Sequence, residues 1–474
     1  IAPYRGESRL RSPANTGLRE STMHAFRPQP DEVNVALFTD LYELTMLQAY
    51  WRERMGEEAV FSLHVRRLPE GRNFLLACGL DDVLAYLESL HFSEEALRYL
   101  RTLGVFAEEF LEWLRGFRFT GDVFAVAEGT PVFAEEPLLE VVAPIAEAQL
   151  VEAFVMNQVH LQTVLASKAA RVVHAAAGRA VVDFGMRRMH GTDAALKAAR
   201  AFHVAGVDST SNVVAGAVYG IPVAGTMAHS FVQAFDREID AFRAFARLYP
   251  TTVLLVDTYD TLEGVRRVVE LARELGDDFR VRGVRLDSGD LAELARGARE
   301  ILDGAGLPRV EIFASGGLDE NGVAELVRQG APITGFGVGT HMGVSSDAPA
   351  LDIAYKLTAY AGKSRLKLSP GKRILPGQKQ VFRVEENGQA VRDVIARWSE
   401  EIAGRPLLQP VMRGGMRLSA GRGTLDEARS RAREEIARLP DSVRELDPAS
   451  PPYPVELSPL LQAHLDEVSH ASGR

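Results

Sequence analysis

Cysteine is nearly absent from this sequence of 474 residues, since Cys78 is the only one. A lone cysteine excludes an intrachain disulfide framework and a thiolate metal cluster, so we expect Cys78 to be a small core residue in a reducing compartment. Long apolar runs are also missing, because none approaches the roughly 20 residues that span a bilayer. The sequence therefore predicts a cytoplasmic protein with no membrane partner.

Positive charge is in short supply. The chain has 54 lysines and arginines against 64 aspartates and glutamates, a formal net charge of −10. Nucleic-acid binding needs a surplus of cations against phosphate, so we expect no nucleic-acid partner. The hydrophobic fraction of 46% and the charged fraction of 25% are those of a globular protein, and the length favours two or three domains.

The sequence pattern divides the chain into four regions. Residues 1–33 mix arginine with proline, serine and glycine and are predicted to be a disordered extension. Residues 34–150 combine helical and strand-like segments, which indicates an N-terminal α+β domain. Residues 151–385 are predicted to form an α/β barrel domain, and we expect residues 386–474 to pack on the N-terminal domain.

The barrel prediction depends on a regular alternation that begins near residue 180. Short apolar strands alternate with helices, which predicts parallel strands joined by crossover helices. Because the units repeat without a dinucleotide-type glycine turn, an irregular TIM-like α/β barrel is favoured over an open sheet, with a small C-terminal extension. The predicted strands are 180–184, 222–227, 253–257, 281–286, 310–314 and 333–338, and the helices include 231–248, 262–275, 291–302 and 320–329.

His229 follows the predicted strand 222–227, where the next helix should begin. Catalytic groups gather at the carboxyl ends of the strands in α/β barrels, so His229 is a candidate nucleophile or general base. The alternative is a histidine that merely caps the helix. The other strand ends favour the catalytic interpretation, because they carry compatible chemistry.

Those other strand ends carry cations, acids and glycines. Arginine can hold a carboxylate or phosphate with two hydrogen bonds, and glycine-rich ends offer backbone N–H groups to phosphate. The acids can orient the histidine, bind ribose hydroxyls or hold a hydrated magnesium ion. Each feature alone can also be a helix cap or a packing residue, but together they suit a phosphorylated sugar substrate. The residues concerned are Phe184, Arg187, Arg188, Asp257, Asp260, Arg285, Asp287, Asp290, Ser315, Gly316, Gly317, Gly335, Gly337 and Gly339.

Seven ordered motifs are similar to those of a known family. They are Thr39-Asp40-Leu41-Tyr42-Glu43-Leu44-Thr45-Met46, Asp183-Phe184-Gly185-Met186-Arg187-Arg188, Thr210-Ser211-Asn212-Val213, Gly225-Thr226-Met227-Ala228-His229-Ser230, Val256-Asp257-Thr258-Tyr259-Asp260, Arg285-Leu286-Asp287-Ser288-Gly289-Asp290 and Lys367-Leu368-Ser369-Pro370-Gly371-Lys372. Over roughly residues 35–385 the chain resembles the nicotinate phosphoribosyltransferase family.

The resemblance implies a fold, a reaction and an assembly. The fold is an irregular α/β barrel with an N-terminal mixed domain. The reaction joins nicotinate to phosphoribosyl pyrophosphate, gives nicotinate mononucleotide and pyrophosphate, and is coupled to ATP hydrolysis with Mg²⁺. The implied place of this reaction is NAD salvage. The implied assembly is a homodimer with its active sites at the subunit interface.

The resemblance also implies roles for individual residues. His229 would be phosphorylated by ATP and oriented by Asp257. Phe184 and Tyr42, the latter from the partner subunit, would stack on the two faces of the pyridine ring. Arg187 or Arg188, and Arg285, would neutralise the carboxylate and phosphates, and Asp287 would bind ribose hydroxyls. Further implied substrate contacts are Ser230, Ser315, Gly316, Gly317, Gly337 and Gly339, while metal ligands stay unassigned.

Other interpretations stay open at this point. A nicotinamide phosphoribosyltransferase would share the fold and histidine but face a neutral amide, and the pair Arg187-Arg188 with the run 209–212 favours the acid. A quinolinate enzyme needs no phosphorylatable histidine. A barrel that only senses nucleotides would have no reason to keep His229 and its acids. Some family members have asparagine at the position after the serine, where this chain has Gly316 after Ser315. The basic loop 363–379 either closes over phosphates or is solvated.

Overall fold

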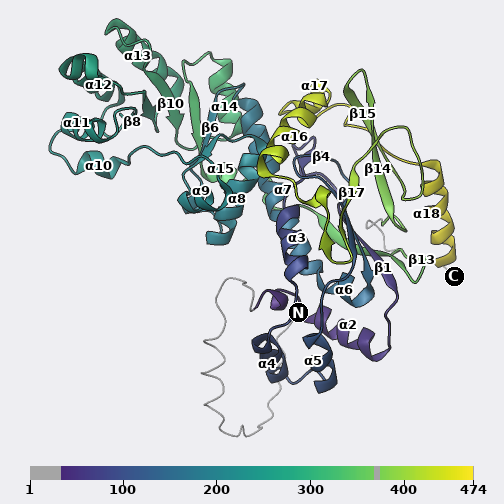
Figure 1. Ribbon diagram of the computed structural model, residues 1–474. Helices are drawn as coiled ribbons and strands as arrows, with labels where there is room; N and C mark the ends of the chain where they lie inside the picture. The colour runs from purple at the N-terminus through teal and green to yellow at the C-terminus, as the bar shows by residue number, and fades with distance from the viewer. Residues whose placement is uncertain (1–33, 368–373, 473–474) are drawn as a thin grey trace, which may run out of the picture.

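The computed structural model describes residues 34–367 and 374–472. The predicted extension 1–33 therefore lies outside the described residues, as do residues 368–373 of the basic loop. Two large sheets organise the molecule, one antiparallel with seven strands and one parallel with six. In Figure 1 they lie side by side, with helix α7 (Glu152–Ala175) between them.

The parallel sheet carries the strand ends singled out in the sequence. Its order is β7-β6-β11-β10-β9-β8, and every neighbouring pair is parallel. Because each strand returns through a crossover helix, all carboxyl ends meet at one edge. The strands are β6 (Ala180–Asp183), β7 (Ser209–Thr210), β8 (Val253–Leu255), β9 (Gly283–Leu286), β10 (Glu311–Ser315) and β11 (Gly335–Val338), and the helices include α8 (Thr192–Ala205), α12 (Thr261–Leu275), α13 (Leu291–Gly304) and α14 (Glu320–Arg328).

The parallel sheet differs from the predicted closed barrel. It is a curled half-barrel whose hydrogen-bonded order begins at β7 and ends at β8. The predicted strand 222–227 is wrong, since among the described residues this segment makes a single bridge, between Thr210 and Val223. Pro222 has no N–H to donate, and Gly225 weakens a strand, which explains the short pairing. Strand β7, which the sequence pattern did not predict, occupies the neighbouring position.

The prediction of one crossover helix over 231–248 is also wrong, because this segment forms two helices. Helix α10 (His229–Gln233) ends after one turn, and α11 (Glu238–Leu248) begins after the extended Arg237. Figure 1 shows both beside α12 at the outer end of the half-barrel. The other predicted helices of this region agree with α12, α13 and α14 to within two residues.

The antiparallel sheet is built from both ends of the chain. Its order is β13-β12-β1-β5-β3-β17-β18, so β1 (Glu58–Val65) and β5 (Pro137–Pro144) pair at its centre. Strand β12 (Ile353–Tyr360) lies inside the range predicted for the barrel, yet it pairs with β1. The remaining strands are β3 (Asp122–Val126), β13 (Lys363–Ser364), β17 (Leu408–Arg413) and β18 (Met416–Arg417).

Helices flank this sheet, and a second small sheet lies beside it. Helix α2 (Leu41–Arg52) begins after Asp40, whose backbone amide donates to the Glu43 carboxylate at 3.3 Å. The small sheet has the order β16-β14-β15-β19. Its strands are β14 (Lys379–Glu386), β15 (Gln389–Arg397), β16 (Arg405–Pro406) and β19 (Val455–Leu457), and nearby helices are α16 (Leu425–Arg438), α17 (Asp441–Arg444) and α18 (Pro459–Ser472).

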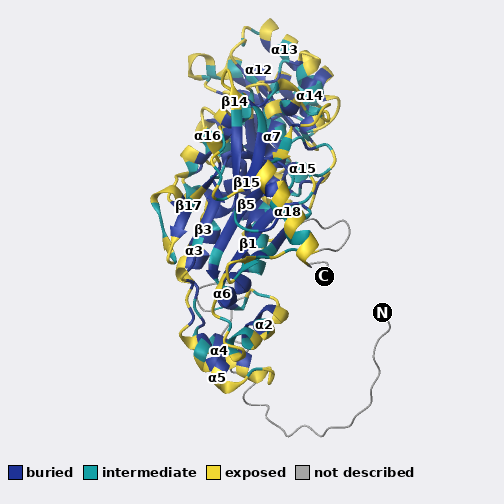
Figure 2. Ribbon diagram, turned by 90° about the vertical axis from the view of Figure 1, so that its right-hand side faces the viewer, coloured by how far each residue is buried: buried dark blue, intermediate teal, exposed yellow. Residues whose placement is uncertain are grey.

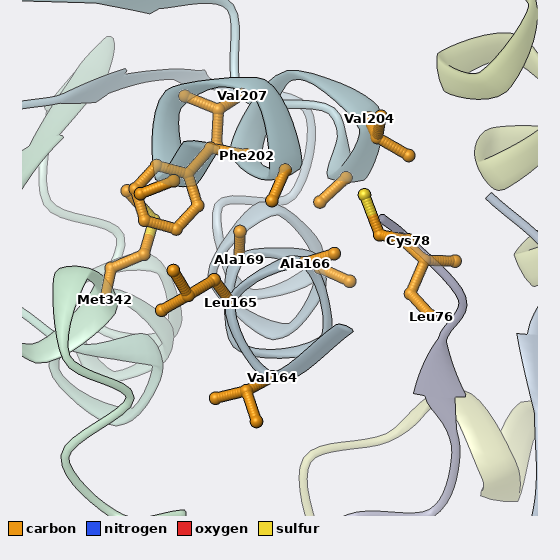
Figure 3. Packing of buried hydrophobic residues seen from close by; sticks show 14 of the residues in the cluster. Leu76, Cys78, Val164, Leu165, Ala166, Ala169, Phe202, Val204, Val207 and Met342 are labelled. Carbon is orange, nitrogen blue, oxygen red and sulfur yellow. The ribbon is translucent and has the colours of Figure 1, made fainter. Parts of the chain in front are cut away.

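Helix α7 joins the two halves through a common core. Small residues such as Ala166 and Ala169 let α8 and the β2 region (Leu75–Leu76) approach it closely (Figure 3). Buried residues fill the middle of the molecule while the outer faces of its helices are exposed (Figure 2). Cys78 is 3% exposed, and burial raises the pKa of its thiol, which confirms the predicted core role. No helix among the described residues is long and apolar enough to cross a membrane.

Candidate active site

The candidate site is formed where the strands of the half-barrel end. Side chains alternate along a strand, so Arg285 and Asp287 at the end of β9 lie on one face of the sheet. In parallel register, β10 places Phe313 beside Arg285, and Ser315 follows two residues later on the same face. The sequence pattern predicted this gathering, because parallel strands place their carboxyl ends together.

His229 is the first residue of α10 and reaches across to the ends of β8 and β9. Its Nδ1 lies 3.2 Å from the Thr258 hydroxyl, and its Nε2 lies 3.9 Å from a carboxylate oxygen of Asp287. The side chain is 40% exposed, so solvent and ligands can reach the ring. The imidazole is thus fixed at one nitrogen and accessible at the other.

The acids at this edge hold one another in place. Asp257 Oδ2 accepts hydrogen bonds from the Asp287 amide at 2.9 Å and the Ser288 hydroxyl at 2.6 Å. Asp287 in turn accepts from the Ser315 hydroxyl. Among the described residues, the hydrogen-bond partner of His229 is therefore Thr258, and the expected contact from Asp257 is replaced by this neighbour. Asp257 instead fixes the turn that carries Asp287.

An arginine and two aromatic rings form the centre of the site. The Arg285 guanidinium lies 5.6 Å from the centroid of Phe184, whose ring is 6.4 Å from that of Phe313. Arg285 donates to the Met227 carbonyl at 3.3 Å, while its buried Nε has no partner among the described atoms. Burial lowers the pKa of Arg285 from its usual range, against the opposing charges of Asp287 and Asp257, and its Nε–H is free to donate to a further acceptor.

Glycine in β11 makes room for these rings. A Cβ at Gly337 would lie 2.5 Å from Cε2 of Phe184, and one at Gly335 would lie 2.7 Å from Cε2 of Phe313. Gly337 is buried within the strand, where it acts as a spacer for the Phe184 ring. Gly316 is different: its φ is +94°, and an added Cβ would lie 1.8 Å from the Asp287 carbonyl oxygen.

Asp183 is a site residue that the sequence interpretation did not select. It is fully buried at the end of β6 and accepts hydrogen bonds from the Gly185 amide and the Thr210 hydroxyl, both at 2.7 Å. Burial raises the pKa of its carboxyl. An acid that ends an apolar strand directly before the aromatic Phe184 was the available signal. Asp183 fixes the turn that presents Phe184 and Arg187.

The remaining predicted residues divide by position. Arg187 and Arg188 are exposed after β6; Arg187 lines a cavity of about 610 Å³ with Met186 and Asn212, and Arg188 Nη1 lies 3.4 Å from the Thr340 hydroxyl. Ser230 is exposed on α10, and Gly317 and Gly339 lie in the loops after β10 and β11.

Tyr42 lies elsewhere within one chain. It is 48% exposed on α2, which both views place at the opposite end of the molecule from the half-barrel (Figures 1 and 2). Phe38 and Leu41 beside it are also exposed apolar residues. A single chain therefore does not bring Tyr42 to Phe184.

Two carboxylates of the site, Asp257 and Asp287, are candidate ligands for a divalent cation. The described residues contain no group of three or more His, Cys, Asp or Glu side chains arranged to hold a metal ion. Asp257 does have a buried oxygen, Oδ1, without a hydrogen-bond partner, and Asp287 is close to it through the shared turn. One or two carboxylates suit Mg²⁺ that keeps waters and substrate phosphates as its other ligands.

Comparison with known proteins identifies similar sequences. The sequence model described as the nicotinate phosphoribosyltransferase N-terminal domain matches residues 37–160, and that of the nicotinate phosphoribosyltransferase family matches residues 179–380. Nicotinate phosphoribosyltransferase pncB2 of Mycobacterium tuberculosis is 58% identical over 436 residues, which cover 92% of this chain and 94% of that protein. The Bacillus subtilis nicotinate phosphoribosyltransferase is 41% identical over 379 residues, 78% of this chain and 77% of the relative.

Solved structures agree with the sequence comparison. The crystal structure of human nicotinic acid phosphoribosyltransferase superposes with a TM-score of 0.80 at 29% identity and covers 90% of this chain and 99% of that one. A nicotinate-nucleotide pyrophosphorylase structure from Pyrococcus furiosus has a TM-score of 0.71 at 24% identity, over 87% of this chain and 98% of the other. The second likeness concerns the fold alone.

Proposed function

The chain belongs to the nicotinate phosphoribosyltransferase family, and from this premise we propose how its strand-end site performs the reaction and uses ATP. The activity is transfer of the 5-phosphoribosyl group from phosphoribosyl pyrophosphate to the ring nitrogen of nicotinate, a step of NAD salvage. The observation that carries the proposal is Arg285, held over Phe184 with a buried nitrogen lacking any described partner.

Nicotinate is recognised by the aromatic and cationic groups at the ends of β6 and β9. The pyridine ring stacks on Phe184, because offset aromatic stacking adds about 0.5–1.5 kcal/mol to burial. Its carboxylate pairs with Arg285 and with Arg187 or Arg188. A guanidinium that burial has left short of partners favours an anion over the neutral amide of nicotinamide, whose oxygen carries only partial charge.

The sugar phosphate binds at the neighbouring strand ends. Backbone amides of Gly316, Gly317 and Gly339 face its phosphate, and Asp287 accepts hydrogen bonds from ribose hydroxyls. The ring nitrogen of nicotinate attacks the anomeric carbon while the bond to pyrophosphate breaks, so positive charge develops on the ribose. Asp287 lies close enough to stabilise that charge. Asp257 and Asp287 would hold Mg²⁺, which would supply positive charge to neutralise the leaving pyrophosphate.

His229 is the proposed acceptor of the phosphoryl group of ATP. Thr258 fixes Nδ1, which leaves Nε2 to attack the γ-phosphorus while the bond to ADP breaks. The phosphoryl group adds about −1.5 to −2 charges at pH 7 by the usual rule for such groups. That charge arises next to Asp287, 3.9 Å from Nε2, so it changes the electrostatics of the phosphate-binding end of the site.

The proposed assembly is a homodimer that shares its sites. Tyr42 is exposed far from Phe184 within one chain, and exposed apolar residues surround it. A second apolar patch, Val213, Val214, Val218 and Val223, is exposed on and after α9 (Val213–Tyr219), next to the turn that carries Phe184. Exposed patches of this kind favour an interface between copies, which would bring Tyr42 of the partner subunit to the pyridine ring. Light scattering at the assay concentration checks for the dimer mass.

A substrate-swap assay tests the proposed chemistry. Nicotinate, nicotinamide and quinolinate are supplied with phosphoribosyl pyrophosphate and Mg²⁺, with and without ATP, to the unaltered protein, to His229→Ala and to His91→Ala. We expect mononucleotide from nicotinate, and stimulation by ATP that is lost in His229→Ala. His91 is a half-buried histidine of the other half, whose variant should behave as the unaltered protein.

Two outcomes would overturn parts of this proposal. Equal turnover of nicotinamide would remove the selectivity assigned to Arg285. Undiminished ATP stimulation in His229→Ala, together with absence of a ³²P-labelled protein from γ-labelled ATP, would remove the role assigned to the histidine.

A further inference from the structure

Five charged side chains form a cluster between α7 and the segments that follow β10 and β11. We call it the ionic junction; it consists of Arg72, Lys168, Arg171, Glu320 and Asp347. The side chains of Arg72, Lys168 and Glu320 are only 1–2% exposed, although they belong to three separate parts of the chain. None of these residues belongs to the motifs recognised in the sequence.

Lys168 links the two acids of the ionic junction. Its Nζ lies 2.7 Å from Asp347 Oδ1 and also pairs with Glu320 Oε2. Arg72 binds the second oxygen of Asp347 at 2.6 Å, and Arg171 binds Glu320 Oε1 at 2.9 Å. Burial acts to raise the pKa of Asp347, but hydrogen bonds from Arg72 and Lys168 hold it well below its usual range. Asp347 therefore stays ionised at any working pH.

The two acids terminate the loops that leave adjacent strands. Glu320 is the first residue of α14, so it lies where the loop that follows β10 ends, three residues after Gly317. Asp347 follows the short helix α15 (Thr340–Gly343), which begins directly after Gly339 at the end of β11. Strands β10 and β11 are hydrogen-bonded neighbours. One ammonium group on α7 thus holds the far ends of both loops.

The loop after β10 has little freedom to move on its own. Gly316 approaches the Asp287 carbonyl so closely that a Cβ would lie 1.8 Å from the oxygen. Its neighbour Gly317 also has a positive φ, +64°. Only Leu318 and Asp319 separate Gly317 from Glu320, so a shift of Glu320 would be transmitted along the chain to the Gly316-Gly317 amides and, through the close approach of Gly316, to Asp287.

We propose that Lys168 is a positioning residue for the phosphoribosyl substrate. By pairing with Glu320 and Asp347, it fixes the separation of the loops after β10 and β11, and so the directions of their backbone amides. This inference rests on the proposed function, which assigns the phosphate to those loops. Buried ion pairs contribute little net stability compared with apolar packing, so a geometric role accounts better for a lysine in this place.

The test separates substrate binding from stability. Lys168→Met keeps the aliphatic stem and removes the ammonium. We expect the KM for phosphoribosyl pyrophosphate to rise by roughly 10- to 100-fold, since a distant misplacement of about 1 Å can cost that much, while the KM for nicotinate changes little. Arg299→Met is the control: Arg299 ties α13 to the Leu307 and Val310 carbonyls before β10, at the opposite edge of the sheet. It should lower the melting temperature without raising this KM.

A double variant keeps the test decisive if Lys168→Met is unstable. Lys168→Met/Glu320→Gln removes the charge from the carboxyl oxygen that lost its ammonium and keeps the other oxygen as an acceptor for Arg171, so it should recover melting temperature in part while the KM for phosphoribosyl pyrophosphate stays raised. Recovery of both together would overturn the positioning role, as would an unchanged KM in a folded Lys168→Met.

A loop variant distinguishes failure of this inference from failure of the proposed function. In Gly317→Ala the added Cβ meets no atom within 4 Å, but the positive φ is strained, so the loop itself is perturbed. A raised KM in Gly317→Ala but not in Lys168→Met would refute the inference and leave the phosphate assignment intact. An unchanged KM in both variants would refute the assignment of phosphate to these loops.

Discussion

Two arginines of this protein each lie over a phenylalanine ring at nearly the same distance, but they differ in how fully other protein groups pair with the guanidinium. Arg383 lies 5.7 Å from the Phe133 centroid in the C-terminal region, and Arg285 lies 5.6 Å from that of Phe184 in the half-barrel. Arg383 binds both carboxylate oxygens of Asp393, at 3.0 and 2.6 Å. Arg285 has one carbonyl partner and a buried nitrogen without any described one.

The difference shows in the pKa values of the two guanidinium groups. Burial acts to lower both, but pairing with Asp393 raises the pKa of Arg383 above its usual range, whereas burial prevails at Arg285 and lowers it. Protein groups pair fully with Arg383, whereas we propose that the substrate supplies the missing partner of Arg285. The pairing of the guanidinium group therefore separates these two arginines.

The largest expected effect is a loss of stability when the ion pair of Arg383 and Asp393 is broken. Arg383→Met leaves Asp393 buried without a cation, so the free energy of unfolding should fall by about 3–5 kcal/mol. Urea denaturation measures this loss. Arg405→Met is the control, since Arg405 also binds Glu435 but is 42% exposed, and its loss should cost about 0–1 kcal/mol. Similar losses in both variants would contradict the comparison.

At Arg285 we expect a smaller effect, on catalysis and not on stability. Arg285→Met removes a charge that has few partners to leave behind, so the free energy of unfolding should change by less than about 1 kcal/mol. The value of kcat/KM for nicotinate should fall by roughly 10²-fold, because a stabilising donor is lost. Steady-state kinetics and urea denaturation on the same preparation check both. A loss of stability like that of Arg383→Met would show that the two arginines are alike.

Glu43 sharpens the comparison, because it is a buried acid whose described hydrogen-bond donors, the Thr39 hydroxyl and the Asp40 amide, carry no charge. Burial is the largest cause that raises its pKa from 4.5 to about 7. The folded state then binds a proton more tightly than the unfolded state, so this contribution to stability is full below pH 4.5 and is lost as pH rises through 7. Glu43→Gln should flatten the fall of melting temperature between about pH 4.5 and 7. An unchanged slope would show that Glu43 is ionised throughout.

Much of the half-barrel could be predicted from the sequence, because hydrophobic alternation and strand-end chemistry are local signals. Asp257, Asp287 and Ser315 meet at one edge for the reason the pattern gave, namely that parallel strands end together. His229 reaches the same edge from the first turn of α10, which follows a segment that is not a strand of the sheet. Closure of the barrel could not be predicted, since it depends on whether the segment 222–227 pairs on both sides. That outcome depends on hydrogen bonds between distant segments, which no local pattern records.

The partners within the site were harder to predict than its members. That Thr258 and not Asp257 contacts His229 depends on a rotation of one residue along a short turn. The role of Gly337 as a spacer depends on the ring of Phe184 in the neighbouring strand. The ionic junction joins residues 275 and 179 positions apart, Arg72 with Asp347 and Lys168 with Asp347, and only the folded chain brings them together.

The antiparallel sheet has a consequence for the order in which the protein is made. Strand β1 pairs with β12, and Ala59 is opposite Tyr360. At a translation rate of about 5–20 residues per second, roughly 15–60 s separate their emergence from the ribosome. The half-barrel strands are synthesised within that interval, so the first strand of the chain waits for its partner while a later region can already fold. During this time β1 has an unpaired edge, which we expect to make it the segment that most needs a chaperone.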